Sequence, residues 1–330
     1  MIVKPDLSER SETEHLLEVC NLSVDYLTAK GTVKAVRDVS FTLDKGKTLG
    51  IVGESGCGKS TLGFSIIRCV PPPGVIRGGS ILFEGIDILK LSEEDIRQIR
   101  GRYISMIMQD PMTSLNPVMR VGEHITEMIA AHDPSLAKEE RKKRAILLME
   151  KLGILKERFE DYPHQFSGGM RQRVMIGLAL ALNPKLVIAD EPTTSLDALV
   201  EAQILTLLNN LRSQLGLTMM LITHNIGIVA ETCDKVIIMY AGEVVEESPT
   251  LDLFEKPLHP YTQGLLRAVP NIRLDQQDLY WIPGSPPDLI NPPEGCSFQQ
   301  RCPYAFAKCK KQPPLTTTSA GRKVRCFLYH

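Results

Sequence analysis

The chain has 330 residues, enough to bury a sizeable core and to hold one large domain with an appendage. Its 38 basic and 39 acidic residues nearly balance, and aromatic residues make up 5%, so nothing indicates a nucleic-acid-binding surface. The longest apolar runs are much shorter than the roughly 18 residues of a membrane span, and residues 1–14 lack an apolar signal-peptide core. We therefore expect a soluble, cytoplasmic protein that reaches a membrane only through a partner.

From residue 16 to about residue 248, apolar strand-like runs alternate with helical patterns. Residues 16–26 and 33–43 predict strands with nearly alternating apolar residues. Shorter, fully apolar runs predict the interior strands of a parallel sheet that helices cover on both faces. These runs are residues 48–53, 103–109, 185–190, 218–224 and 235–240. Predicted helices at residues 59–70, 167–182 and 199–216 lie between them, which is the α/β pattern.

A polar helical block at residues 136–153 predicts an α-helical insertion of about residues 110–182, with its basic run on a solvated face. After Pro249 the composition changes, and the proline-rich residues 282–295 predict no regular structure. We expect an N-terminal tail of residues 1–15, a main domain of residues 16–255 and an appendage of residues 256–330.

Residues 53–60, GESGCGKS, fit the phosphate-loop pattern G-x-x-x-x-G-K-[ST] between a predicted strand and a predicted helix. Glycine lets backbone N–H groups approach a phosphate without interference from Cβ atoms. Lys59 is expected to reach the β- and γ-phosphates of a nucleotide, and Ser60 to bind Mg²⁺. Cys57 is interpreted as a small loop residue, and a redox role is the weaker alternative. The predicted nucleotide-binding residues are Gly53, Glu54, Ser55, Gly56, Cys57, Gly58, Lys59, Ser60 and Thr61.

Polar side chains stand at the ends of three predicted strands. Asp190 ends residues 185–190, which places a carboxylate where a Mg²⁺-organising acid belongs. Glu191 follows it and is positioned to polarise an attacking water. His224 is expected to contact the γ-phosphate, and Gln109 to touch both metal and water.

A second glycine-containing loop, Ser167, Gly168 and Gly169, opens another helix and offers free N–H groups to an anion. One nucleotide needs only one phosphate loop. The simplest use of the second loop is a nucleotide carried by another chain, so that two subunits enclose ATP head to tail and hydrolysis releases them.

These motifs, together with Ser-Leu-Asp at residues 195–197, occur in the order found in ATP-binding cassette (ABC) ATPases, which the chain resembles over residues 16–248. The resemblance implies a P-loop ATPase core with a RecA-like parallel sheet, an antiparallel β subdomain and a helical subdomain. It also implies that Tyr26 stacks on adenine, that Asp197 communicates across the dimer, and that Glu191 is the catalytic base. Phe166 and Met170 depart from the commonest signature, which has Leu and Gln there.

The stretches MQDPMTSLNP and KPLHPYTQGLL resemble the nucleotide-binding subunits of bacterial oligopeptide and dipeptide importers, a group that includes nickel importers. The resemblance implies that this chain lies at the cytoplasmic face of the inner membrane as a peripheral subunit, with a second cassette subunit in a heterodimer and two integral membrane permease subunits. It also implies an extracytoplasmic solute-binding protein that acts indirectly. The alternatives are a soluble ABC ATPase of repair or translation and a metal-binding protein with a regulatory nucleotide site.

Four cysteines in the last 35 residues have the spacing C-x5-C-x6-C-x16-C: Cys296, Cys302, Cys309 and Cys326. Four thiolates suit Zn²⁺ or an iron–sulfur cluster. The lack of a close C-x₂₋₄-C pair and the Cys302-Pro303 step favour a structural [4Fe–4S] cluster, which the resemblance also implies. Zn²⁺ is the alternative, and four reduced cysteines packed in a small apolar patch are the simplest one.

Overall fold

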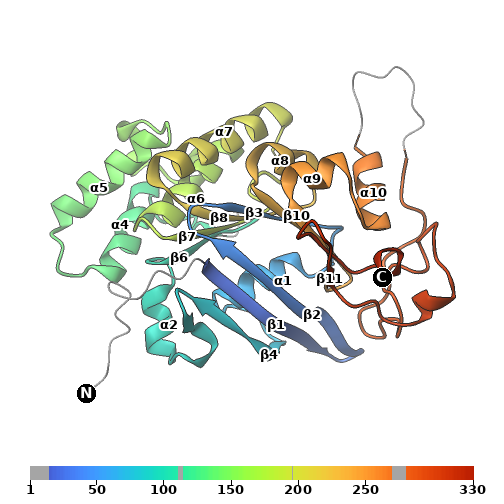
Figure 1. Cartoon of the computed structure of the whole chain (residues 1–330). Helices are drawn as coiled ribbons and strands as arrows, with labels where there is room; N and C mark the ends of the chain where they lie inside the picture. Colours follow the sequence, from blue (N-terminus) through green and yellow to red (C-terminus); the bar gives the residue numbers. More distant parts are fainter. Residues whose placement is uncertain (1–14, 111–113, 195, 270–279) are drawn as a thin grey trace. The chain divides into compact units, whose positions relative to one another are not determined.

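The computed structural model describes residues 15–110, 114–194, 196–269 and 280–330. The chain divides into two compact units (Figure 1), one containing Leu91–Met220 and the other Glu12–Lys90 with Leu221–His330. Ser195 and nearly all of the expected N-terminal tail lie outside the described residues. The domain limits expected at residues 255 and 256 stay a prediction.

The unit made of Glu12–Lys90 and Leu221–His330 contains an antiparallel sheet in the order β2-β1-β4-β5. The alternating pattern forms it as predicted, because Leu17, Val19 and Phe41 face the core while their neighbours are less buried. The strands are β1 (His15–Thr28), β2 (Gly31–Asp44), β4 (Gly74–Phe83) and β5 (Ile86–Asp87). This confirms the antiparallel β subdomain.

In the same unit, β3 (Thr48–Val52) pairs in parallel with β9 (Lys235–Tyr240). Every residue of β3 is buried, as expected for an interior strand. Helix α1 (Lys59–Ile66) follows β3 and ends earlier than the predicted residue 70, because Arg68 adopts a positive φ of 51° that no helix continues. The other helices of this unit are η1 (Ile88–Lys90), α8 (Ile226–Thr232), α9 (Thr250–Glu255), α10 (Pro260–Arg267), η4 (Ala307–Lys310) and η5 (Phe327–Tyr329).

The C-terminal segment adds strands to this unit, which the sequence did not predict. β12 (Lys323–Val324) pairs with β10 (Glu243–Pro249), which in turn pairs with β9, and β11 (Thr316–Thr317) pairs with β12. Residues 282–295 form neither helix nor strand, as predicted. Strands of the C-terminal extension therefore continue the sheet of this unit beyond β10.

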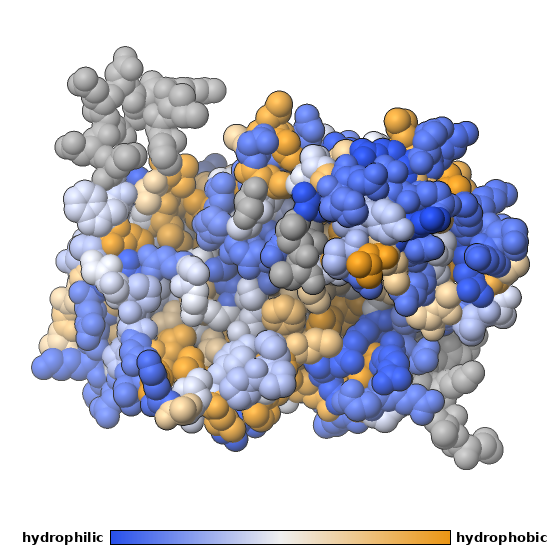
Figure 2. All heavy atoms as spheres, turned by 180° about the vertical axis from the view of Figure 1, so that it is seen from behind, coloured by the Kyte–Doolittle hydropathy of each residue, from blue (hydrophilic) through white to orange (hydrophobic). Residues whose placement is uncertain are grey.

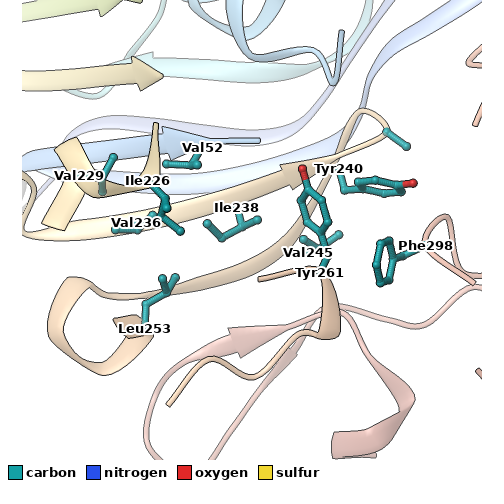
Figure 3. Close-up of a cluster of buried hydrophobic side chains, with 11 residues drawn as sticks. Val52, Ile226, Val229, Val236, Ile238, Tyr240, Val245, Leu253, Tyr261 and Phe298 are labelled. Atoms are coloured by element: carbon teal, nitrogen blue, oxygen red, sulfur yellow. The ribbon is translucent and has the colours of Figure 1, made fainter. Parts of the chain in front are cut away.

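Aromatic packing also joins the extension to the rest of this unit (Figure 3). Tyr240 of β9, Tyr261 of α10 and Phe298 of the extension meet with ring centroids 4.7, 5.2 and 5.4 Å apart. They belong to one buried cluster that also contains Val52, Ile226, Val229, Val236, Ile238, Ala241, Val245 and Leu253. Burying aromatic rings is the main source of stability in such a cluster.

The unit that contains Leu91–Met220 holds the parallel pair β6 (Ile104–Ile107) and β7 (Leu186–Asp190). Two of its predicted helices, residues 167–182 and 199–216, are confirmed as α6 (Gly168–Leu180) and α7 (Ala198–Leu215). Helix α7 begins at the N-cap Asp197 and ends at Gly216, whose φ of 63° suits glycine. The predicted helical insertion is present, with α4 (Val121–His132), α5 (Lys138–Lys151), η2 (Lys156–Glu160) and η3 (Pro163–Gln165), and α2 (Glu93–Ile99) precedes it. The division between the units falls within β8 (Thr218–Thr223).

Within the described ranges, no helix combines the length and the apolar character that a membrane crossing requires. On the face drawn in Figure 2, hydrophilic and hydrophobic residues are interspersed.

Candidate functional site

The phosphate-loop pattern lies directly after β3 and ends in α1, as predicted. Two of its glycines have no room for a side chain. A Cβ at Gly53 would lie 2.2 Å from the carbonyl oxygen of Met239, and one at Gly58 2.1 Å from that of Ala35. Gly58 also has a φ of 99°, which L-residues rarely adopt. Glycine therefore lets the loop backbone pack closely against its neighbours. The absence of side chains at these positions also lets a phosphate approach the backbone N–H groups.

Lys59 lies across this loop and is almost completely buried. Its ammonium group donates to the carbonyl oxygens of Gly53 and Glu54, at 2.8 and 3.0 Å. These bonds hold the lysine inside the loop, in the place where its charge can meet a phosphate.

Cys57 and Tyr26 belong to the same unit as the phosphate loop. Cys57 is 5% exposed, and burial raises the pKa of its thiol, which opposes thiolate formation and supports the interpretation as a small loop residue. The hydroxyl of Tyr26 lies 3.3 Å from that of Thr61 in α1, so the aromatic ring stands beside the phosphate loop. His224 is exposed and comes directly after β8.

In the unit containing Leu91–Met220, Asp190 is buried at the end of β7 and Glu191 follows it. Glu191 has a φ of 46°, an uncommon backbone conformation for a non-glycine residue. One oxygen of its carboxylate accepts hydrogen bonds from the Gln109 amide at 3.0 Å and the Thr194 hydroxyl at 2.8 Å. The structure therefore brings Gln109 and Glu191 into direct contact, which the sequence, although it assigned both residues to one site, did not predict.

The second glycine loop begins α6, with Ser167 as N-cap and its hydroxyl accepting from the Met170 N–H. Ser167 and Gly168 are exposed, so the first turn is open to a ligand on another molecule. The two departures from the commonest signature have one partner in common: the guanidinium of Arg158 lies 4.3 Å from the ring centroid of Phe166 and donates to the sulfur of Met170. Both side chains therefore have a packing role behind the loop.

Asp197 is exposed and caps α7 by accepting from the Val200 N–H at 2.9 Å. A structural role thus accompanies the expected role across a dimer, and that expected role stays a prediction.

The four C-terminal cysteines line one small cavity together with aromatic residues and His259. All four are free thiols, and burial raises the pKa of Cys296 to about 11, with a further contribution from the other three. This donor set fits an iron–sulfur cluster. The cavity has a volume of about 10 Å³, enough for roughly one water. Within the described ranges, no three His, Cys, Asp or Glu side chains converge tightly enough for a single metal ion.

Two family models match the chain. An ABC transporter model matches residues 36–194, and the oligopeptide/dipeptide transporter C-terminal region matches residues 245–309. The oligopeptide transport ATP-binding protein OppD of Bacillus subtilis (strain 168) is 48% identical over 320 residues, which cover 96% of this chain and 89% of that protein. The chain belongs to the ATP-binding subunits of ABC transporters.

Another relative and a solved structure of this ABC ATPase family show the same similarity. OppD of Salmonella typhimurium is 49% identical over 314 residues, covering 94% of this chain and 93% of that protein. The dimeric post-hydrolysis structure of the ATP-binding cassette MJ0796, bound to ADP and Pi, is 28% identical with a TM-score of 0.63, and the match covers 71% of this chain and 98% of that one. The resemblance, the P-loop ATPase fold and the ATPase activity expected from the motifs are thereby confirmed.

Sequence reasoning missed three residues that the structure adds to this ABC ATPase site. Thr194 bonds Glu191, and the Thr-Thr run after Pro192 was the only available signal. Arg301 and Tyr261 bond Glu54 of the phosphate loop from more than 200 residues away. Tyr261 lies in the stretch KPLHPYTQGLL, but nothing in that stretch indicates a contact with the phosphate loop, and no sequence pattern marks Arg301.

Proposed function

We propose that this ABC ATPase powers the import of di- or oligopeptides. The observation that supports peptide cargo is the match of residues 245–309 to the C-terminal region of oligopeptide and dipeptide transporters. The relatives named oligopeptide transport ATP-binding proteins extend that likeness over nearly the whole chain. Import of nickel or another solute by the same family is the alternative, because subunits other than this one select the cargo.

The proposed role of each site residue follows from its chemistry. Lys59 and the loop N–H groups stabilise phosphate charge, while Ser60, Gln109 and Asp190 would hold Mg²⁺, which would offset the charge of the phosphates. Glu191 is the base that orients and deprotonates the attacking water, and the bonds from Gln109 and Thr194 aim its carboxylate. His224 contacts the γ-phosphate, and Tyr26 stacks on adenine.

We further propose that ATP is enclosed by two subunits. The exposure of Ser167 and Gly168 at the start of the 13-residue helix α6 supports this, since a helix N-terminus attracts phosphate. The partner is a second, different cassette subunit. The two cassette subunits lie at the cytoplasmic face of the membrane, where their closure and hydrolysis move two integral permease subunits, and an extracytoplasmic binding protein delivers the peptide.

The test is co-expression of the chain with the permease and partner cassette subunits of a peptide importer. Peptide-stimulated ATP hydrolysis and peptide uptake in vesicles are expected, and Lys59→Ala should abolish both. Uptake of radiolabelled nickel without peptide uptake would favour the nickel alternative. Purification with ribosomes or DNA instead of membrane subunits would favour a soluble ATPase of translation or repair.

For the four-cysteine cavity we propose a [4Fe–4S] cluster that stabilises the extension, with Zn²⁺ as the alternative. The four thiols around one cavity support this assignment. Anaerobic purification followed by iron, sulfide and zinc analysis tests it. About four irons and four sulfides per chain are expected, and Cys302→Ser should lose them. Stoichiometric zinc would support the alternative. If neither iron nor zinc is found, the four cysteines are simply packed as reduced thiols.

A further inference from the structure

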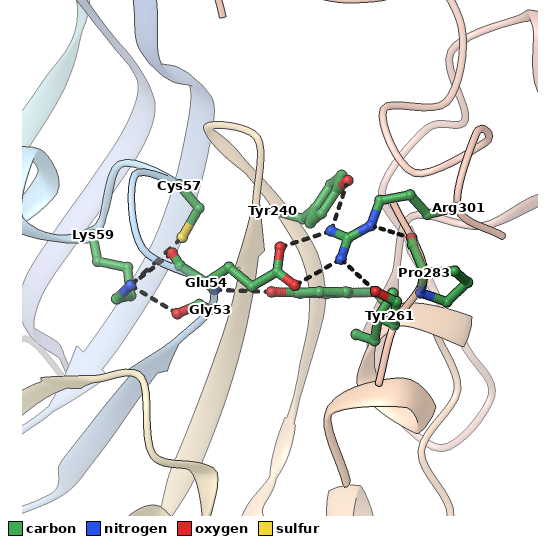
Figure 4. A network of polar contacts seen from close by, with 9 residues as sticks. Gly53, Glu54, Cys57, Lys59, Tyr240, Tyr261, Pro283 and Arg301 are labelled. Atoms are coloured by element: carbon green, nitrogen blue, oxygen red, sulfur yellow. Dashed lines mark hydrogen bonds and ion pairs between the residues drawn. The ribbon is translucent and has the colours of Figure 1, made fainter. Parts of the chain in front are cut away.

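Glu54, the second residue of the phosphate loop, is held by the C-terminal extension (Figure 4). The guanidinium of Arg301 donates to both oxygens of the Glu54 carboxylate, at 2.7 and 2.9 Å. The Arg301 side chain is 5% exposed and that of Glu54 is 28% exposed. Such a two-point contact between planar groups fixes both partners in distance and in orientation.

Arg301 is itself fixed by the groups around it. It donates to the backbone oxygens of Pro283 and Ile282 at 3.0 and 3.2 Å, and to the hydroxyl of Tyr240 at 3.3 Å. Its guanidinium also lies 5.7 Å from the ring centroid of Tyr240. Nε donates only to Pro283, while Nη1 and Nη2, which bind the carboxylate, also donate to Tyr240 and Ile282. A guanidinium has five N–H groups, enough for all of these bonds, so the cation is held in place for Glu54.

The backbone of Glu54 has a second anchor. Its N–H donates to the hydroxyl of Tyr261 at 2.9 Å, while its carbonyl oxygen accepts from Lys59. Tyr261 is fully buried and packs against Tyr240 and Phe298. The loop residue is therefore bound on its side chain and on its backbone by residues that follow the cassette in sequence.

A carboxylate at this position works against nucleotide binding unless it is neutralised. The loop is built for a triphosphate of several negative charges, and like charges within about 10 Å repel appreciably in a partly buried site. Arg301 supplies the opposite charge and keeps the carboxylate turned to the extension. We infer that Arg301 and Tyr261 are positioning residues that set the affinity of the phosphate loop for nucleoside triphosphate through Glu54. The inference rests on the assignment of residues 53–60 as the phosphate loop.

The test measures ATP and AMP dissociation constants in the full chain with Mg²⁺, for Arg301→Gln and for the double variant Arg301→Gln with Glu54→Gln. Arg301→Gln should bind ATP about tenfold more weakly, with a smaller loss for AMP. The double variant should regain most of the affinity, because it no longer carries an unpaired carboxylate. Arg325→Gln is the matched control, since Arg325 lies in the same extension and donates to the carbonyls of Val244 and Pro313. It should bind ATP as wild type does.

Tyr261→Phe keeps the ring in its cluster and removes only the acceptor of the Glu54 N–H. It should fold and bind ATP several-fold more weakly, so it tests the inference even where Arg301→Gln fails to fold. Wild-type affinity in Arg301→Gln, or a double variant no tighter than Arg301→Gln, would overturn the inference. A wild-type chain that binds no ATP would instead refute the assignment of the phosphate loop.

Discussion

The two glycines of the Ser-Gly-Gly loop differ in the space around them, and this difference gives a quantitative prediction. A Cβ at Gly169 would lie 2.5 Å from Cγ1 of Val200 in α7, a distance that real Cβ atoms do not show. A Cβ at Gly168 would meet only Cδ2 of Leu196, at the ordinary contact distance of 3.5 Å. Alanine should therefore fit at Gly168 and force a displacement at Gly169.

The expected magnitude follows from two terms. Alanine gains about 0.5–1 kcal/mol over glycine in a helix, and this gain is similar at both positions because both lie in the first turn of α6. Overpacking at Gly169 costs about 1–3 kcal/mol. The free energy of unfolding of Gly169→Ala should therefore lie about 1–3 kcal/mol below that of Gly168→Ala, which should be at least as stable as wild type.

Urea unfolding followed by far-ultraviolet circular dichroism measures this difference, with ATP hydrolysis of the assembled transporter measured beside it. Gly168→Ala should lose hydrolysis although its stability is intact, because the added methyl group occupies the exposed turn offered to the partner's phosphate. Equal unfolding midpoints and slopes for the two variants would refute the packing explanation. Normal hydrolysis in Gly168→Ala would refute the role of the loop at the nucleotide.

Three further predictions concern the catalytic base, the dimer and the fold. Glu191→Gln should lower ATP turnover by about 10²–10⁴-fold and trap ATP-bound dimers on size-exclusion chromatography; undiminished turnover would exclude Glu191 as the base. Ser167→Arg should block ATP-driven dimer closure while nucleotide binding to the variant's own phosphate loop, measured by equilibrium dialysis, stays normal. Arg322→Gln should cost about 3–5 kcal/mol of unfolding free energy, because it leaves the fully buried carboxylate of Glu246 without its cation. The exposed pair of Arg144 is its control, and Arg144→Gln should change stability by less than about 0.5 kcal/mol.

Features that depend on consecutive residues were predictable from the sequence, and features that depend on distant residues were not. The phosphate loop, the strand that precedes it and the buried strand ending at Asp190 were predictable, because each depends on consecutive residues whose chemistry is local. The capped start of α6 was predictable for the same reason. The end of α1 was not, since the positive φ of Arg68 leaves no mark in the pattern of apolar residues.

The amino-acid sequence by itself determined which residues are proposed to bind and cleave a nucleotide, because that chemistry requires certain side chains at fixed spacings along the chain. Only the tertiary structure decided which distant residues hold them. Gln109 donates a hydrogen bond to Glu191, and β12 pairs with β10. The guanidinium of Arg301 binds the carboxylate of Glu54 across 247 positions of sequence. Such contacts depend on how whole elements pack, and packing energy is spread over many residues, so no short stretch of sequence encodes it.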